Sequence, residues 1–180
     1  MRDIILRVGI LVALVLSLVG GFLFWEKYKK SKLEKLAYKE YEISKLVQAG
    51  NYEKAKELIK ELSKDGSFKP LALSYKLYMG EEDDKTIKEI LESLKDKDLK
   101  ALYTERYAHY LFKQGKDQEA IKSLEAIKEE DFNYPSAMLL KAQILKKMGK
   151  EQEAKELLKV VREKAKDTYF ANIALALLGE

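Results

Sequence analysis

The chain has 180 residues, of which 47% are hydrophobic and 36% are charged, and its formal net charge is +4. This length is enough for one core of ordinary size. The net charge is too small and the charges too mixed in sign for a nucleic-acid-binding surface. The chain has no cysteine, which excludes disulfides, thiolate metal sites and thiol nucleophiles.

The N-terminal region is strongly apolar. No formal charge interrupts Val8 to Trp25, and Ile4 to Trp25 would span about 33 Å as a helix, against about 30 Å for a bilayer core. A cleaved signal peptide is the alternative, but no small-x-small cleavage site precedes Phe22. We therefore expect residues 1–25 to form a short tail and a single transmembrane anchor. Basic residues flank both ends of this stretch, so charge alone leaves its orientation open.

A helical pattern follows the apolar stretch directly. No Pro or Gly lies between Trp25 and Ala49, and apolar residues recur at helical spacing from Leu33 to Val47. The anchor is therefore expected to continue without a break into the first helix of the domain that residues 26–180 form.

The second half of the chain contains an internal repeat. Gly115 and Gly149 are 34 residues apart, and so are Ala120 and Ala154. A fixed period of 34 residues with two amphipathic helices per unit is the tetratricopeptide signature. Each such unit buries its apolar faces by stacking on its neighbours, which makes a protein-binding scaffold the expected class.

The same pattern extends over most of the chain. Gly50 and Gly80 mark two earlier turns. We predict an all-α fold. It begins with a transmembrane helix, continues as a tetratricopeptide-like α-solenoid and ends with a capping helix at residues 168–178. About four repeats are expected, at residues 33–62, 67–94, 99–128 and 133–164. In the third repeat the second helix is expected to run from Gln118 to Lys128.

No catalytic, cofactor or metal site is predicted. His109 is the single histidine of the chain, and the numerous carboxylates have lysines three or four residues away, as on any solvated helix. The acidic turn Glu81–Asp84 has the chemistry to hold a divalent cation, but a solvated turn is the preferred interpretation. The sequence therefore predicts a non-enzymatic protein without cofactors.

The first helix of each tetratricopeptide repeat lines the ligand groove. Its groove positions in the third and fourth repeats predict a partner surface made of Leu102, Glu105, His109, Phe112, Lys113, Ser136, Leu139, Gln143, Lys146 and Lys147. For His109, a half-exposed position without a role is the alternative. The series Tyr103, Tyr107 and Tyr110 is expected to pack between helices.

Three segments resemble one family of membrane proteins. They are FWEKYKKSKLEKLAYKEYE, KPLALSYKLYM and LFKQGKDQEAIKSLEAIKEEDFNYPSAMLLKAQILKKMGKEQEAKELL. The chain resembles the YfgM-type ancillary subunits of the SecYEG translocon, which are single-pass proteins of the bacterial inner membrane. The resemblance implies a periplasmic C-terminal domain that contacts translocon subunits, a membrane-anchored periplasmic chaperone and exported clients.

Two functional hypotheses follow. The first is a membrane-anchored scaffold that acts with the Sec translocon and periplasmic chaperones on newly exported proteins. The second is an assembly scaffold of another envelope complex, with self-association through the apolar C-terminal helix. That helix contains Phe170, Ile173, Leu175, Leu177 and Leu178. We expect these side chains to be buried against the second helix of the fourth repeat, and an exposed contact surface is the alternative.

Overall fold

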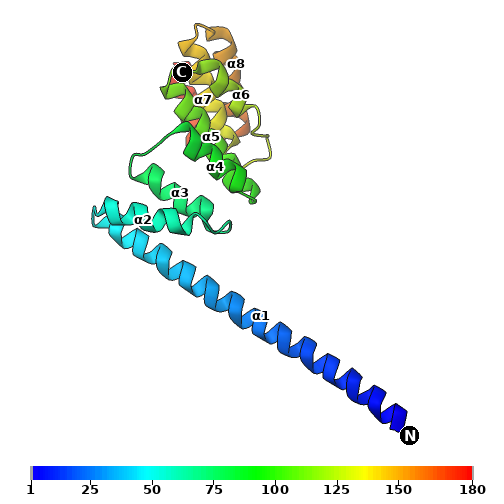
Figure 1. Ribbon diagram of the computed structural model, residues 1–180. Helices are drawn as coiled ribbons and strands as arrows, with labels where there is room; N and C mark the ends of the chain where they lie inside the picture. Colours follow the sequence, from blue (N-terminus) through cyan, green and yellow to red (C-terminus); the bar gives the residue numbers. More distant parts are fainter. Residues whose placement is uncertain (1, 180) are drawn as a thin grey trace. The chain divides into compact units, whose positions relative to one another are not determined.

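The computed structural model describes residues 2–179; side chains are described for Leu14 and from Leu16 onward. The described residues form helices and no strands, so the expected all-α helical-repeat architecture is confirmed (Figure 1). The helices are α1 (Arg2–Gln48), α2 (Tyr52–Leu62), α3 (Lys69–Tyr78), α4 (Asp84–Ser93), α5 (Lys97–Lys113), α6 (Asp117–Leu124), α7 (Tyr134–Lys147), α8 (Glu151–Lys164) and α9 (Tyr169–Leu178). The chain divides into two compact units, Met1–Phe68 and Lys69–Glu180.

The first unit consists of α1 and α2. Helix α1 is unbroken from Arg2 to Gln48, so the expected continuity of the helix beyond Trp25 is confirmed. Its C-terminal turns pack against α2. Two ion pairs connect the helices and the loop that follows: Lys39 Nζ lies 2.5 Å from Glu61 Oε2, and Lys32 Nζ lies 2.7 Å from an Asp65 carboxylate oxygen.

The expected transmembrane anchor is wrong. Within the described residues, no helix combines the length and the apolar character needed to cross a membrane. Half of the expected span from Ile4 to Trp25 falls on residues 4–13 and Val15, whose side chains lie outside the described ones. The described apolar run begins at Leu14, ends at Trp25 and is followed by charged residues from Glu26. It is about 18 Å long, against about 30 Å for a bilayer core. The expected single-pass location in the inner membrane, with a periplasmic C-terminal domain, depended on this anchor and is corrected with it.

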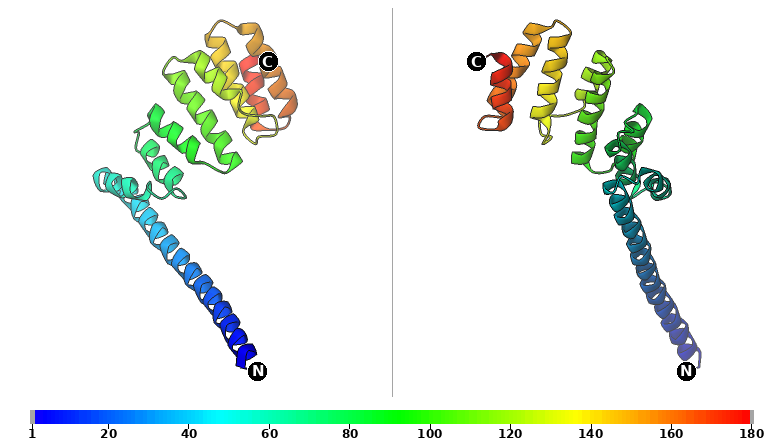
Figure 2. Two further views of the ribbon diagram at one scale, coloured as in Figure 1. Left: turned by 45° about the vertical axis from the view of Figure 1, so that its right-hand side comes forward. Right: turned by 90° about the vertical axis from the view of Figure 1, so that its left-hand side faces the viewer.

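The second unit contains α3 to α9, and α7 is its central helix. Half of the residues of α7 are buried, and α7 packs against α5, α6, α8 and α9. Both views of Figure 2 show α7, α8 and α9 side by side. Ile144, Leu124, Leu111 and Val161, from four different helices, are at most 1% exposed and belong to one cluster.

Helices α3, α5 and α7 of this unit share the same C-terminal geometry, and after α3 the Glu81 N–H donates to Lys76 O. After α5 the Lys116 N–H donates to Leu111 O at 2.9 Å, and after α7 the Lys150 N–H donates to Leu145 O at 2.9 Å. This bond to the residue five positions earlier defines the Schellman cap, which requires a left-handed residue. Gly115 has φ +75° and Gly149 has φ +77°, so the repeated glycines meet that requirement.

Small residues follow the turns after α5 and α7. Ala120 and Ala154, five residues after their glycines, are 0% and 2% exposed. A larger side chain at either position would separate the two helices of its pair, because buried sites tolerate little extra volume. The 34-residue spacing therefore reflects two requirements, a left-handed turn and a close helix contact.

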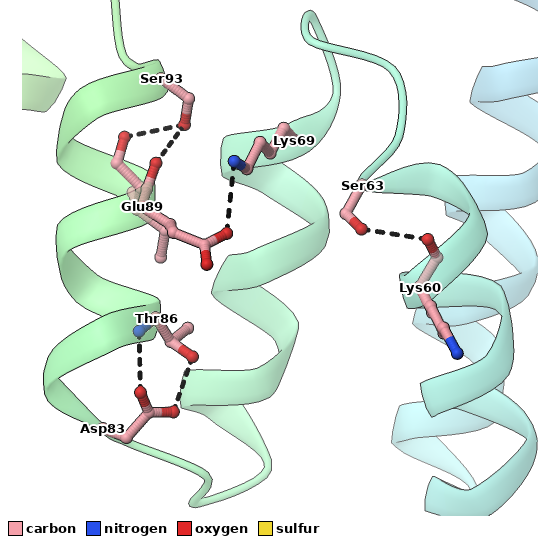
Figure 3. A network of polar contacts seen from close by, with 8 residues as sticks. Lys60, Ser63, Lys69, Asp83, Thr86, Glu89 and Ser93 are labelled. Carbon is pink, nitrogen blue, oxygen red and sulfur yellow. Dashed lines mark hydrogen bonds and ion pairs between the residues drawn. The ribbon is translucent and has the colours of Figure 1, made fainter.

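Side-chain contacts fix the start of α4. Asp83 accepts hydrogen bonds from the Thr86 N–H at 2.8 Å and from the Thr86 hydroxyl at 2.7 Å (Figure 3). Asp is among the preferred N-cap residues, and the cap satisfies a helix N–H that has no partner within the helix. One turn further along α4, Glu89 forms an ion pair with Lys69 of α3 at 3.2 Å, which joins the two helices.

Helix α6 is shorter than the expected Gln118–Lys128. It ends at Leu124, and the chain then turns through Ile127, whose N–H donates to Leu124 O. The Asp131 carboxylate accepts a hydrogen bond from the Lys128 N–H at 2.8 Å, which competes with a helical bond at that residue. The turn places Phe132 and Asn133 ahead of α7.

The C-terminal helix α9 packs against α7 and α8. Ala171 and Ala174 are buried, and Phe170, Ile173, Leu177 and Leu178 are partly buried against the main cluster. Its apolar composition is therefore explained by packing within the second unit.

We predict that Gly149→Ala lowers the free energy of unfolding by about 1–2 kcal/mol, because a Cβ disfavours the left-handed conformation. No atom lies within 4 Å of the added Cβ, so the cost would come from the backbone alone. Urea denaturation followed by circular dichroism measures it. Gly149→Asn is the matched control and should cost less, since Asn tolerates this conformation; equal losses for Ala and Asn would contradict the explanation.

Candidate functional site

An open cavity of about 470 Å³ lies in the second unit, beside α5, α7 and α9. The loop before α7 completes it. The lining residues are Leu102, Glu105, Arg106, His109, Phe132, Asn133, Ser136, Leu140 and Phe170. They combine apolar side chains with a few polar groups, which is the usual composition of a ligand site.

The α5 wall follows from helical spacing. Leu102, Glu105 and His109 are three and four residues apart, which places them on one face of the helix. Leu102 is 44% exposed although it is apolar. Arg106 also reaches the cavity, and its Nε donates to Glu82 Oε1 at 3.0 Å. The α5 wall therefore offers one carboxylate, one imidazole and one guanidinium that already has an anionic partner.

Asn133 joins α5 to the start of α7. Its Nδ2 donates to Ala101 O at 3.0 Å and to Glu105 Oε2 at 2.7 Å. Both partners are acceptors, so the amide nitrogen must face them and the orientation of the amide is unambiguous. Asn133 is 4% exposed, and its Oδ1 is buried without a hydrogen-bond partner among the described residues.

A second donor holds the same carboxylate. The Ser136 hydroxyl lies 2.9 Å from Glu105 Oε2 and 3.0 Å from Asn133 O, and its single proton goes preferentially to the charged acceptor. Both lone pairs of Glu105 Oε2 are thus used. Glu105 Oε1 has no hydrogen-bond partner among the residues that the structure describes. The carboxylate is fixed in orientation and keeps one free oxygen.

Asp131 holds the loop that carries Phe132. Its Oδ2 accepts from the Lys128 N–H at 2.8 Å, and Lys97 Nζ lies 3.0 Å from its Oδ1. The Lys128 N–H, and after it the Lys97 ammonium, hold the pKa of the Asp131 carboxyl below its ordinary value. The loop is therefore tied to the start of α5 while this carboxyl is ionised.

The remaining walls are apolar. Phe132 lies on the loop and is 60% exposed. An aromatic side chain with this much exposed surface is available for contact with a partner. Leu140 of α7 is buried and Phe170 of α9 is partly buried. These side chains offer hydrocarbon and ring surface around the fixed carboxylate.

The structure brings four of the sequence-predicted groove residues together in the cavity, namely Leu102, Glu105 and His109 of α5 and Ser136 of α7. The others lie elsewhere: Leu139 is buried in the core, Lys113, Gln143 and Lys146 are exposed outside the cavity lining, and Phe112 is half-buried.

Lys147 also lies outside the cavity. Its Nζ is 4.8 Å from the centre of the Phe112 ring and 2.9 Å from Asp117 Oδ1. The tyrosines of α5 are partly buried against the hydrophobic clusters, and the rings of Tyr107 and Tyr110 stack with centroids 6.5 Å apart.

The acidic turn before α4 uses its carboxylates within the fold. Glu82 pairs with Arg106, Asp83 caps α4, and Asp84 pairs with Lys88 and accepts from the Tyr107 hydroxyl at 2.7 Å. Within the part of the chain that is described, no group of three or more carboxylate or histidine side chains is placed to hold a metal ion.

Sequence reasoning missed five of the cavity-lining residues. Phe132 and Asn133 lie in a loop, Phe170 lies in the capping helix, and Arg106 and Leu140 are one position from predicted groove residues. The groove rule considers one helix face per repeat and gives no signal for loop residues. The asparagine directly ahead of a helix was the available hint, since such residues often bond to backbone groups.

Three comparisons with known proteins bear on this site. Residues 5–169 match the tetratricopeptide repeat-like domain family. An uncharacterized protein of Aquifex aeolicus (strain VF5) is 31% identical over 174 residues, which cover 97% of this chain and 93% of that protein. No solved structure matches the chain.

We predict that Asn133→Ala destabilises the protein more than Ser136→Ala does. Asn133 provides two hydrogen bonds, and its loss leaves the buried Ala101 carbonyl without a side-chain donor. The expected losses in unfolding free energy are about 2 kcal/mol for Asn133→Ala and about 1 kcal/mol for Ser136→Ala. Urea denaturation of both variants measures them. Equal losses would contradict the larger role assigned to Asn133.

The lowered pKa of Asp131 predicts an acid-sensitive contribution to stability. The pKa of an aspartate carboxyl in the unfolded chain is about 3.9. When the folded-state pKa is lower, the carboxyl contributes its full stabilisation at pH values above the unfolded-state pKa. The contribution is lost as pH falls through the folded-state pKa. Thermal unfolding between pH 2 and pH 6 should therefore show a smaller acid loss for Asp131→Asn than for the unchanged protein.

Lys97→Met is the matched control for this pH dependence. It removes the ion pair and keeps the stronger Lys128 N–H contact, so part of the acid loss should remain. An unchanged acid loss in Asp131→Asn would contradict the assignment to Asp131.

Proposed function

Because the chain belongs to the tetratricopeptide repeat-like domain family, we propose that it is a non-catalytic scaffold that binds another protein in the cavity beside α5, α7 and α9. Stacked helical repeats commonly present a concave surface to a partner chain. The observation that carries the proposal is the exposed Phe132 and Leu102 beside the fixed Glu105 carboxylate. Apolar anchors around a few oriented polar groups are the usual composition of an interaction hot spot.

We propose further that the partners belong to the Sec protein-export machinery and act on newly exported proteins. The support is the resemblance of three segments, from FWEKYKKSKLEKLAYKEYE to the repeat pair, to YfgM-type subunits. Translocon subunits, the chaperones that accompany them and exported clients are the candidate partners. Self-association through α9 has less support, because its apolar side chains pack on α7 and α8.

Site-specific crosslinking in the source organism tests both proposals. A photo-reactive benzoylphenylalanine at position 109, which lines the cavity, should crosslink to a Sec subunit, an associated chaperone or an exported client. The same group at position 155, exposed on α8 and outside the cavity, is the matched control. Crosslinks to such proteins from position 155 alone would reject the cavity as the binding site. Specific crosslinks from position 109 to proteins unrelated to export would reject the Sec assignment and keep the scaffold.

A further inference from the structure

Among the residues that the structure describes, the Glu105 carboxylate has no cationic partner. Its two hydrogen-bond donors, the Asn133 amide and the Ser136 hydroxyl, are neutral. No ion pair found among the described residues includes it, and the nearest basic residue in sequence, Arg106, donates its Nε to Glu82. An ionised carboxylate beside apolar walls is favourable only when it is hydrogen-bonded, paired or solvated. The cavity thus holds a fixed negative charge that a partner's cation would complement.

The free oxygen restricts the geometry of that cation. Oε2 accepts both internal hydrogen bonds, which leaves Oε1 as the one oxygen with open lone pairs. An arginine guanidinium binds carboxylates best through two parallel bonds to both oxygens, whereas a lysine ammonium is a point charge that needs one. A carboxylate with one free oxygen therefore favours lysine.

The apolar walls suit the rest of a lysine side chain. Leu102, Leu140 and Phe170 provide surface for its methylene groups, which bury readily while the ammonium stays at a polar partner. The exposed Phe132 ring offers a face that attracts a cation. A cavity of about 470 Å³ has room for this side chain and for part of its neighbours.

We propose that the cavity binds a lysine side chain of the partner polypeptide, with the ammonium on Glu105 Oε1 and the methylene stem against Leu102, Leu140 and Phe170. The inference rests on the proposed function and specifies what the cavity recognises. Recognition is then selective for a lysine flanked by apolar residues, and it weakens as salt concentration rises because the pair is reached from solvent.

Three matched peptides test this proposal: acetyl-Ala-Leu-X-Leu-Ala-amide with X as lysine, arginine or norleucine. Norleucine keeps the straight apolar stem of lysine and lacks the charge. The single histidine, His109, lines the cavity, so its imidazole proton signal in NMR titrations reports binding there. We expect the lysine peptide to bind about 10-fold or more tightly than norleucine, as a charged hydrogen bond warrants. It should also bind more tightly than arginine.

Glu105→Gln is the decisive variant. The glutamine oxygen keeps an acceptor for Asn133 and Ser136, so the fold is retained and circular dichroism should confirm it. Lysine and norleucine peptides should then bind equally. Glu119→Gln removes an exposed carboxylate of α6 outside the cavity and should leave the lysine preference unchanged.

Separate outcomes overturn this inference and the proposed function. Equal binding of lysine and norleucine to the unchanged protein rejects the lysine site, while peptide binding at His109 keeps the cavity as a protein-binding surface. A lysine preference that survives Glu105→Gln also rejects the assignment. If no peptide moves the His109 signal, the lysine site is rejected, and the crosslinks from position 109 decide the proposed function independently.

Discussion

The cavity depends on the two hydrogen bonds that the side-chain amide of Asn133 donates. The amide spans two helices, because its nitrogen reaches the Ala101 carbonyl and the Glu105 carboxylate of α5 from the start of α7. The bond to Ala101 fixes the approach of the helices, and the bond to Glu105 orients the charge. Removing a buried amide of this kind leaves acceptors without donors, which costs more than the bonds themselves contribute. One residue therefore holds the two helices together and orients the carboxylate to which we assign recognition.

The repeat geometry could be predicted because its causes are local. Gly115 and Gly149 carry left-handed turns, and Ala120 and Ala154 lie five residues later at buried helix contacts. Each signal involves a few neighbouring residues, so the spacing of 34 is visible without a structure. The contacts of Asn133 join residues 28 and 32 positions apart, and no periodic pattern marks them.

Two other differences between expectation and structure have physical causes of their own. Helix α6 was expected to reach Lys128, but the N–H of that residue bonds to the Asp131 carboxylate, and helical periodicity carries no sign of this competition. The transmembrane anchor was inferred from the hydropathy of residues 4–25, and the described part of α1 contains no apolar run long enough to cross a membrane. The continuity of α1 beyond Trp25 was predictable, because no Pro or Gly lies between Trp25 and Ala49 and apolar residues recur there at helical spacing.

The position of Glu105 allows binding and folding to be separated in this cavity. Asn133 and Ser136 require only an acceptor at Oε2, whereas a bound cation requires the charge and the free Oε1. A glutamine meets the first requirement and fails the second, so it removes the charge while the helix contact persists. A lysine at position 105 would fail both, since it would place a donor against two donors. The proposed lysine binding therefore depends on the charge of residue 105, whereas the contact with Asn133 and Ser136 depends on its ability to accept hydrogen bonds.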